Sequence, residues 1–338
     1  MVLYFSVFWL SCRPVLYIML RDITPKPVRL FAAKHIFPKS PVIWANFRPI
    51  VQLCTNRLKP QEPPVVILSL PRSGSSWVGE ILGGAGDALY LREPLTQTYL
   101  RSGGEKKLSF FEFDGPPWEY EKAADLSFRA IPQFSKGIVR FPEQWGLNCR
   151  TRKKTVIKEV NPFVLPWLMQ KYQPRIIYLV RHPASTAHSF HKMGWDGRNQ
   201  FERRFLDRSL AEINDYQRWA GSFWSAHAAV QSVVLKRVLE QAKGYESFKL
   251  VQYENLCKDP INEFRSLYDF AGLKWDEAAE DLVVKKTQPS QVDKHSFSTQ
   301  RNSAVEAEKW RKLVSADKLE LIKEAWLWYD PPLYRDEW

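Results

Sequence analysis

The chain has 338 residues, 45% of them apolar, and a formal net charge of +12. This length and composition are ordinary for a globular protein, and we expect one main domain. The four cysteines, Cys12, Cys54, Cys149 and Cys257, form no CxxC pair, which argues against a zinc site and against a disulfide framework.

Residues 1–60 form a basic and partly apolar N-terminal segment. They hold nine Lys and Arg against Asp22 alone, so two thirds of the net charge lies there. Arg13-Pro14 separates two short apolar runs, neither of which approaches the roughly 20 residues that a membrane-spanning helix needs. Two interpretations stay open: a segment that lies on an anionic membrane surface, or a helix packed on its own domain.

A second unit is predicted from residue 61 to residue 338. The proline-rich stretch RLKPQEPP, residues 57–64, is typical of a linker that leads into a strand. Four apolar, β-branched runs follow at 64–70, 155–160, 175–181 and 248–254. Continuous apolar strands that alternate with helices indicate an α/β fold with a parallel sheet covered on both faces.

Helices are predicted where apolar residues recur with a spacing near 3.6. The expected ranges are 75–82, 183–192, 209–243, 261–271 and 315–328. Residues 103–150 show weak periodicity, and we expect loops there that shape an acceptor site.

The stretch PRSGSSW, residues 71–77, predicts an anion site. A strand that ends in a Gly/Ser turn and enters a helix directs backbone N–H groups and a positive dipole end at one spot. Aligned with the GxxxxGK[ST] loop of nucleotide triphosphatases, Gly74 matches the second glycine, but Ser69 replaces the first one and Ser75 replaces the lysine. A triphosphate loop is therefore disfavoured, and the nearby cation is Arg72.

A second phosphate site is indicated by RIIYLVRHPASTAHSF. Arg181 ends the predicted strand, and Ser189 follows eight residues later inside the next predicted helix. A guanidinium and a hydroxyl that converge in this way can hold a phosphate. Taken alone, Arg181 could instead pair with a surface carboxylate. His188 and His191 are expected to form a polar helix face and no metal site.

With these two motifs the sequence resembles the sulfotransferases that use 3′-phosphoadenosine 5′-phosphosulfate (PAPS) as donor. PRSGSSWVGEIL resembles their 5′-phosphosulfate loop, and LVRHPASTAHS resembles their 3′-phosphate motif, with His182 in place of a frequent Asp. QYENLCKDP, STQRNS and EKWRKL extend the resemblance over residues 64–330. It implies the P-loop-like sulfotransferase fold, with a central parallel sheet flanked by helices.

The resemblance also implies which residues hold the donor. Backbone and hydroxyl groups of Ser73, Gly74, Ser75 and Ser76 correspond to the 5′-phosphate site. Arg181 and Ser189 correspond to the 3′-phosphate site, to which Arg301 would add a late arginine, although the RKG pattern of the cytosolic enzymes is absent. Trp77 and Tyr253 correspond to aromatic residues beside the adenine, and the alternative for Trp77 is packing in the core.

Three residues are expected to carry the chemistry. Arg72 lies beside the loop and can neutralise the charge that develops on the bridging oxygen of the departing phosphate, and no metal is demanded. Lys158 resembles a strand-end lysine that several membrane-associated sulfotransferases use for the same purpose. A hydroxyl acceptor must also lose a proton to a base. Glu93 in LREPL matches the catalytic glutamate of protein-tyrosine sulfotransferases. The alternative for Glu93 is a structural ion pair with Arg92 or Arg72.

The expected reaction moves a sulfonate to a hydroxyl, or less readily an amine, of a glycan, lipid or small molecule. Two other functions stay open: a P-loop kinase for a small molecule, and a non-catalytic nucleotide-binding protein at a membrane. Nucleic acid is disfavoured as a partner, because no groove motif combines the basic residues with aromatic ones. The expected location is the cytoplasm, with peripheral attachment at a membrane, and the Golgi membrane is the alternative.

Overall fold

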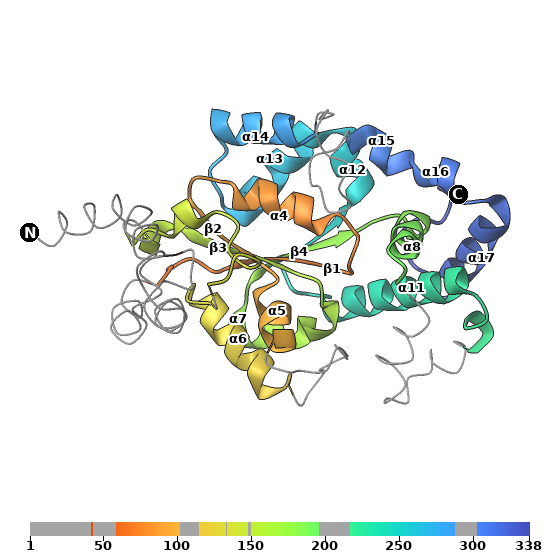
Figure 1. Cartoon of the computed structure of the whole chain (residues 1–338), viewed down its shortest axis with the longest axis horizontal. Coiled ribbons are helices and arrows are strands. Elements are labelled where there is room, and N and C mark those ends of the chain that lie inside the picture. Colours follow the sequence, from red (N-terminus) through yellow and green to blue (C-terminus); the bar gives the residue numbers. More distant parts are fainter. Residues whose placement is uncertain are drawn as a thin grey trace, which may run out of the picture.

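A computed structural model describes residue 42 and residues 59–101, 115–132, 134–147, 150–195, 217–287 and 303–338 (Figure 1). The predicted N-terminal segment and Arg301 lie outside these residues, apart from positions 42, 59 and 60. Within the described part, no helix is both long and apolar enough to cross a membrane.

The centre of the molecule is a parallel sheet of five strands, which confirms the α/β prediction. Their order is β2-β3-β1-β4-β5, and Val66 of β1 lies opposite Ile157 of β3 and Ile176 of β4. Four strands match the predicted runs. The bounds are β1 Val65–Ser69, β2 Ala88–Arg92, β3 Lys154–Glu159, β4 Arg175–Val180 and β5 Phe248–Gln252.

Alternate side chains of β1 belong to two separate hydrophobic cores, one on each face of the sheet. Val65 and Ile67 point to one face of the sheet, and Val66 and Leu68 point to the other. All four are fully buried. This explains why the strand is a continuous apolar run and lacks the alternation of a half-exposed strand.

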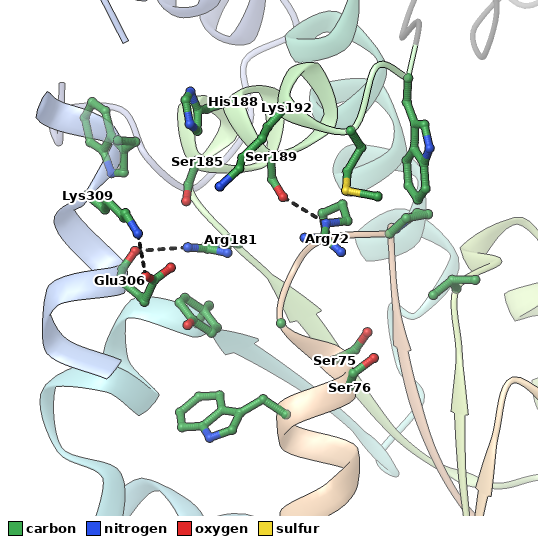
Figure 2. Close-up of a pocket in the computed structure, with 18 of the residues that line it drawn as sticks. Arg72, Ser75, Ser76, Arg181, Ser185, His188, Ser189, Lys192, Glu306 and Lys309 are labelled. Atoms are coloured by element: carbon green, nitrogen blue, oxygen red, sulfur yellow. Dashed lines mark hydrogen bonds and ion pairs between the residues drawn. The ribbon is translucent and has the colours of Figure 1, made fainter. Parts of the chain in front are cut away.

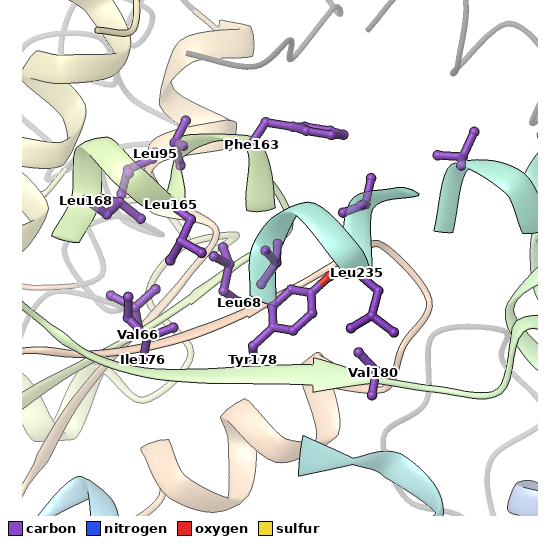
Figure 3. Close-up of a cluster of buried hydrophobic side chains, with 14 of the residues drawn as sticks. Val66, Leu68, Leu95, Phe163, Leu165, Leu168, Ile176, Tyr178, Val180 and Leu235 are labelled. Atoms are coloured by element: carbon purple, nitrogen blue, oxygen red, sulfur yellow. The ribbon is translucent and has the colours of Figure 1, made fainter. Parts of the chain in front are cut away.

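Helices cover both faces of the sheet (Figure 1). One face carries the chain segments α4 (Ser75–Gly83), α13 (Pro260–Ala271) and α14 (Glu277–Thr287). The other core contains α5 (Pro94–Arg101), α6 (Trp118–Phe128), α7 (Leu165–Tyr172), α11 (Phe223–Gln241) and α17 (Ala316–Leu327). Figure 3 shows this second core, where Leu68 and Tyr178 of the sheet lie near Leu235 of α11.

The remaining α-helices of the described part lie beyond the carboxyl ends of the central strands. They are α8 (Pro183–Lys192), α12 (Tyr253–Lys258), α15 (Ser303–Glu308) and α16 (Trp310–Leu313). The predicted bounds of α8 are confirmed at both ends. Pro183 at its first turn fits the helix because its missing N–H would have no intrahelical partner there.

One long predicted helix and one predicted loop region differ from the structure. The helix expected at 209–243 is interrupted in its described part: residues 217–219 are helical, residues 220–221 form a turn, and α11 begins at Phe223. Ser222 has extended backbone, and its hydroxyl accepts from Trp224 N. Ser222 is therefore the N-cap of α11 and prevents the helix from continuing into the preceding turn. Within 103–150, residues 118–128 form α6, because Tyr120 and Ala124 are buried against the core.

Candidate functional site

The turn between β1 and α4 has the geometry of an anion-binding loop. Gly74 caps α4 with φ of 94°, and its carbonyl accepts from Trp77 N at 3.0 Å. The N-terminal end of α4, with Ser75 and Ser76, therefore lines the cavity described below. Ser69 Oγ donates to Ser75 Oγ at 2.8 Å and fixes the loop against the end of β1. The positive end of the helix dipole favours an anion here.

Only a glycine fits at position 74. A Cβ there would lie 2.5 Å from Cδ2 and Cε2 of Tyr253, and the positive φ already disfavours any other residue. The Tyr253 ring thus lies directly over the loop. Tyr253, directly after β5, thus reaches across β4 to the loop that follows β1.

Gly74→Ala is expected to weaken binding of adenosine 3′,5′-bisphosphate by about tenfold or more. The new Cβ must displace the Tyr253 ring, and backbone strain of this kind costs about 1–3 kcal/mol. Calorimetric titration measures the change. Gly86→Ala is the matched control, since a Cβ at Gly86 meets nothing within 4 Å. Equal affinities of the two variants would contradict the assigned role of the loop.

The two predicted phosphate motifs meet in space. Arg72 Nε donates to Ser189 Oγ at 2.8 Å, although the residues are 117 positions apart (Figure 2). Arg72 has φ of 69°, a conformation that non-glycine residues adopt rarely. Strain of this kind persists where the surroundings hold a side chain in place, which is common at functional sites.

Arg181 lies at the end of β4 and is held by two contacts. Its Nη2 donates to the carbonyl of Glu306 at 3.0 Å, and its guanidinium lies over the Tyr253 ring at 4.3 Å from the centroid. Within the described residues, the partners of Arg181 are this carbonyl and this aromatic ring, and no carboxylate forms an ion pair with it. The guanidinium fixed in this way lines the cavity.

Trp77 belongs both to the core and to the cavity wall. It is 7% exposed, its Nε1 donates to Lys286 O at 3.2 Å, and its ring makes edge contacts with Tyr253 and Phe264. The core-packing interpretation is thus confirmed. Trp77 and Tyr253 also line the cavity, so a small part of each residue borders it.

Glu93 and Lys158 form an ion pair beneath the cavity. Lys158 Nζ contacts Glu93 Oε1, and Glu93 N donates to Lys158 O at 2.6 Å. Neither Arg92 nor Arg72 is the partner, so the pairing considered from the sequence is wrong. The reason is strand order: β2 lies beside β3, with Arg92 opposite Lys158.

Burial sets the electrostatics of this pair. The Lys158 side chain is 3% exposed, and that of Glu93 is 21% exposed. Burial lowers the pKa of Lys158 from its usual range, while the Glu93 carboxylate counteracts this. Glu93 also has φ of 50° at the end of β2, which makes it the second strained non-glycine residue on the cavity wall.

Glu159 fixes the turn that carries Glu93. Its carboxylate accepts from Leu95 N at 2.7 Å, from Thr96 N at 3.3 Å and from Thr96 Oγ1 at 2.6 Å, all in the first turn of α5. Glu159 is fully buried, and burial raises its pKa to about 7 from an ordinary value of 4.5. Because Glu93 lies directly before α5, this anchor fixes where β2 ends.

The raised pKa of Glu159 predicts a pH dependence of stability. Between pH 4.5 and 7 the folded chain keeps a proton that the unfolded chain has lost, so the free energy of unfolding falls as pH rises through this window. In Glu159→Gln this pH-dependent fall in the free energy of unfolding should be absent. The difference in the free energy of unfolding between the variant and the wild type, measured by urea unfolding, should therefore shift in favour of the variant by up to about 3 kcal/mol from pH 4.5 to pH 7.5. A difference that does not change with pH would contradict the protonation state assigned to Glu159.

These side chains surround one cavity of about 370 Å³ at the carboxyl ends of the strands. Among the described residues its lining holds six Lys and Arg and two carboxylates, a net charge of +4 when His188 is neutral. Burial and nearby lysines lower the pKa of His188, which keeps it neutral. The lining residues with charge are Arg72, Arg92, Glu93, Lys158, Arg181, Lys192, Glu306 and Lys309.

A sequence model of the sulfotransferase family matches residues 63–277, more than half of the chain. The chain belongs to the sulfotransferase family. Mouse carbohydrate sulfotransferase 3 is 23% identical over 299 residues, an alignment of 73% of this chain and 62% of that protein. Mouse carbohydrate sulfotransferase 5 is 24% identical over 308 residues, with 77% of each chain covered.

The chain thus spans less than two thirds of the length of the first of these relatives. Among solved structures, the sulfotransferase domain of the Synechococcus olefin synthase is similar at 18% identity and a TM-score of 0.43. The similarity covers 79% of this chain and 95% of that domain.

His182 departs from the aspartate common in the sulfotransferase 3′-phosphate motif, and its structural role explains how it is accommodated. Its Nδ1 accepts from Ala184 N at 3.3 Å and so caps α8, which is what an aspartate would also do. The ring stacks on Trp310 at 4.0 Å, and burial lowers the pKa of His182 to about 3. His182 therefore acts as a neutral cap and adds no charge next to Arg181.

The cavity brings together ten of the predicted site residues. They are Arg72, Gly74, Ser75, Ser76, Trp77, Glu93, Lys158, Arg181, Ser189 and Tyr253. Ser73 is buried in the same loop but does not line the cavity. Sequence reasoning missed Ser185 and Lys192, which share the cavity side of α8 with Ser189 (Figure 2). Their spacings of four and three residues from Ser189 would have indicated this.

Proposed function

We propose that this chain is a sulfotransferase that moves a sulfonate group from PAPS to a hydroxyl of a carbohydrate acceptor. One observation carries the proposal: an anion loop, a second cationic site and a carboxylate–lysine pair line the same cavity. A donor with a 3′-phosphate and a 5′-phosphosulfate carries about four negative charges. This matches the net +4 of the cavity.

In the proposal, two sites among the described residues bind the two phosphate-bearing ends of the donor. In the proposal the α4 N-terminus, from Ser73 to Ser76, holds the 5′-phosphate. Arg181 and Ser189 hold the 3′-phosphate, and Trp77 and Tyr253 lie beside the adenine. The contact between Arg72 and Ser189 supports this division, since it brings the two anion sites to adjacent positions. Arg301 remains an additional predicted ligand outside the described residues.

Glu93, Lys158 and Arg72 carry the transfer step. Glu93 accepts the proton of the acceptor hydroxyl while that oxygen forms its bond to sulfur. Lys158 and Arg72 neutralise the charge on the bridging oxygen as the bond between sulfur and this oxygen breaks. Bound PAPS supplies the activated sulfonate. Because Lys158 pairs with Glu93, the residue proposed to neutralise the leaving oxygen lies next to the residue proposed to accept the proton.

The carbohydrate acceptor is proposed because the chain belongs to the sulfotransferase family and the named relatives are carbohydrate sulfotransferases. The charge match argues against the need for an acidic acceptor, because the donor alone offsets the cavity charge. The attachment of residues 1–60 to an anionic membrane, and the location of the protein in the cell, stay predictions.

Transfer of radiolabelled sulfonate tests this function. The purified chain is incubated with labelled PAPS, EDTA and the methyl β-glycosides of galactose, N-acetylgalactosamine and N-acetylglucosamine. The expected result is a labelled sugar in the presence of the chelator. Transfer from labelled ATP in the presence of magnesium, with none from PAPS, would replace the proposal by the kinase alternative.

A further inference from the structure

One side of α8 forms a continuous wall of the cavity. Its lining residues are Ser185, His188, Ser189, Lys192 and Met193, a spacing of three and four residues that places them on one helix face. Ser185 lies near the start of the helix, Ser189 and Lys192 lie in its second half, and Met193 caps its end. The wall is therefore polar up to Lys192 and apolar at Met193, and Trp195 continues it.

The direction of α8 shows which part of the cavity this apolar end faces. The helix follows β4, and the hydrogen bond from Arg72 to Ser189 brings its middle next to the loop after β1. In the sheet, β1 separates β4 from β3 and β2. Residues beyond Ser189 therefore extend past Arg72, toward the strand ends that carry Lys158 and Glu93.

The sequence FHKMGW holds Trp195 in place by a Schellman motif. Trp195 N donates to Phe190 O at 3.1 Å, and Gly194 N donates to His191 O at 3.0 Å, with Gly194 at φ of 68°. The Trp195 ring makes an edge contact with the buried ring of Phe190 at 5.1 Å. Trp195 is nevertheless 38% exposed, so a fixed aromatic surface remains open at the cavity wall.

We infer that Trp195 is a platform for the pyranose ring of the acceptor and so determines acceptor specificity. The inference rests on the proposed function, which requires an acceptor hydroxyl at Glu93. A pyranose presents C–H groups on one face and hydroxyls at its edge. An aromatic ring takes the C–H face, which leaves an edge hydroxyl free to approach Glu93. Arg181, Tyr253 and the α4 N-terminus hold the nucleotide on the other side of Arg72 and do not need Trp195.

The test compares the wild type with Trp195→Ala, Trp195→Phe and Trp118→Ala. Trp118 is the matched control, since it is 64% exposed at the start of α6 and does not line the cavity. The probes are the methyl β-glycosides of galactose, N-acetylgalactosamine and N-acetylglucosamine, whose aglycone has no aromatic ring. Saturation-transfer NMR measures sugar contact in the presence of adenosine 3′,5′-bisphosphate, and label transfer measures KM and kcat.

We expect Trp195→Ala to raise the sugar KM by about tenfold and to abolish saturation transfer to the ring C–H protons, with kcat little changed. Trp195→Phe should keep most of the affinity, and Trp118→Ala should behave as the wild type. The dissociation constant of the bisphosphate should be the same in all four proteins.

Three results would overturn the inference. They are an unchanged sugar KM and saturation transfer in Trp195→Ala, an equal loss of bisphosphate affinity in that variant, or no saturation transfer from the wild type to any of the three sugars. A different result would show that the proposed donor site, and not the platform, is wrong. The wild type would then not bind the bisphosphate, whereas sugar contact that depends on Trp195 would still support the platform.

Discussion

Lys158→Met is expected to lower kcat for sulfonate transfer by a factor of about 10²–10³. Removal of one fixed donor that stabilises developing charge typically has an effect of this size. The methionine keeps an unbranched apolar side chain in a site where that of Lys158 is 3% exposed. Because a cation is lost from the cavity, adenosine 3′,5′-bisphosphate should also bind severalfold more weakly. Label transfer and calorimetry measure the two effects.

Lys154→Ala is the matched control for this variant. Lys154 lies at the amino-terminal end of β3, the same strand that carries Lys158 near its carboxyl end. Its Nζ contacts the carbonyl of Gly272, away from the cavity. This variant should keep both kcat and bisphosphate affinity. If Lys158→Met retained wild-type kcat, the role of Lys158 in neutralising the leaving oxygen would be rejected.

Glu93→Gln is expected to lower kcat by a factor of about 10²–10⁴, the usual contribution of a general base. Unlike Lys158→Met, this variant should not weaken binding of the bisphosphate. The substitution removes one of the two carboxylates on the cavity wall, so the bisphosphate should bind equally well or more tightly. The side chain keeps its size, and the turn anchored by Glu159 is unaffected.

The pH profile distinguishes a base from a structural carboxylate. For the wild type, kcat/KM should rise with pH, as expected of a reaction that uses a general base, and this rise should be missing in Glu93→Gln. Near-normal turnover of the variant with the bisphosphate still bound would leave Glu93 only its structural ion pair with Lys158.

The sequence predicted most of the sheet because two central strands, β1 and β4, are apolar on both faces. PVVILSL and RIIYLVR supply buried residues to both cores, which produces a strong continuous signal. The strand β2 was missed. Its five residues, ALYLR, include Arg92 and lie at the edge of the sheet, where a short strand with a charged end is hard to distinguish from a loop.

The predicted site residues converge because parallel strands end at the same edge of the sheet. This rule was sufficient to bring Arg72, Glu93, Lys158 and Arg181 to one cavity. It could not give the partner of Glu93, since the pairing with Lys158 depends on β3 lying between β2 and β1. That order is not contained in any local pattern.

Other contributions to the site come from segments whose local sequence does not indicate it. Lys309 and Glu306 reach the cavity from the C-terminal part of the chain. Trp195 is different. Its Schellman motif is readable from MGW after a helix, yet the cavity beside it becomes visible only when α8 is placed against β1.

The donor is the central claim, and calorimetric titration without divalent metal tests it most directly. The purified chain is titrated with adenosine 3′,5′-bisphosphate and, separately, with ATP. A cavity in which the contact of Arg72 with Ser189 brings two anion sites to adjacent positions should bind the bisphosphate in the micromolar range and ATP far more weakly. Tight binding of ATP with magnesium, together with weak binding of the bisphosphate, would contradict the account.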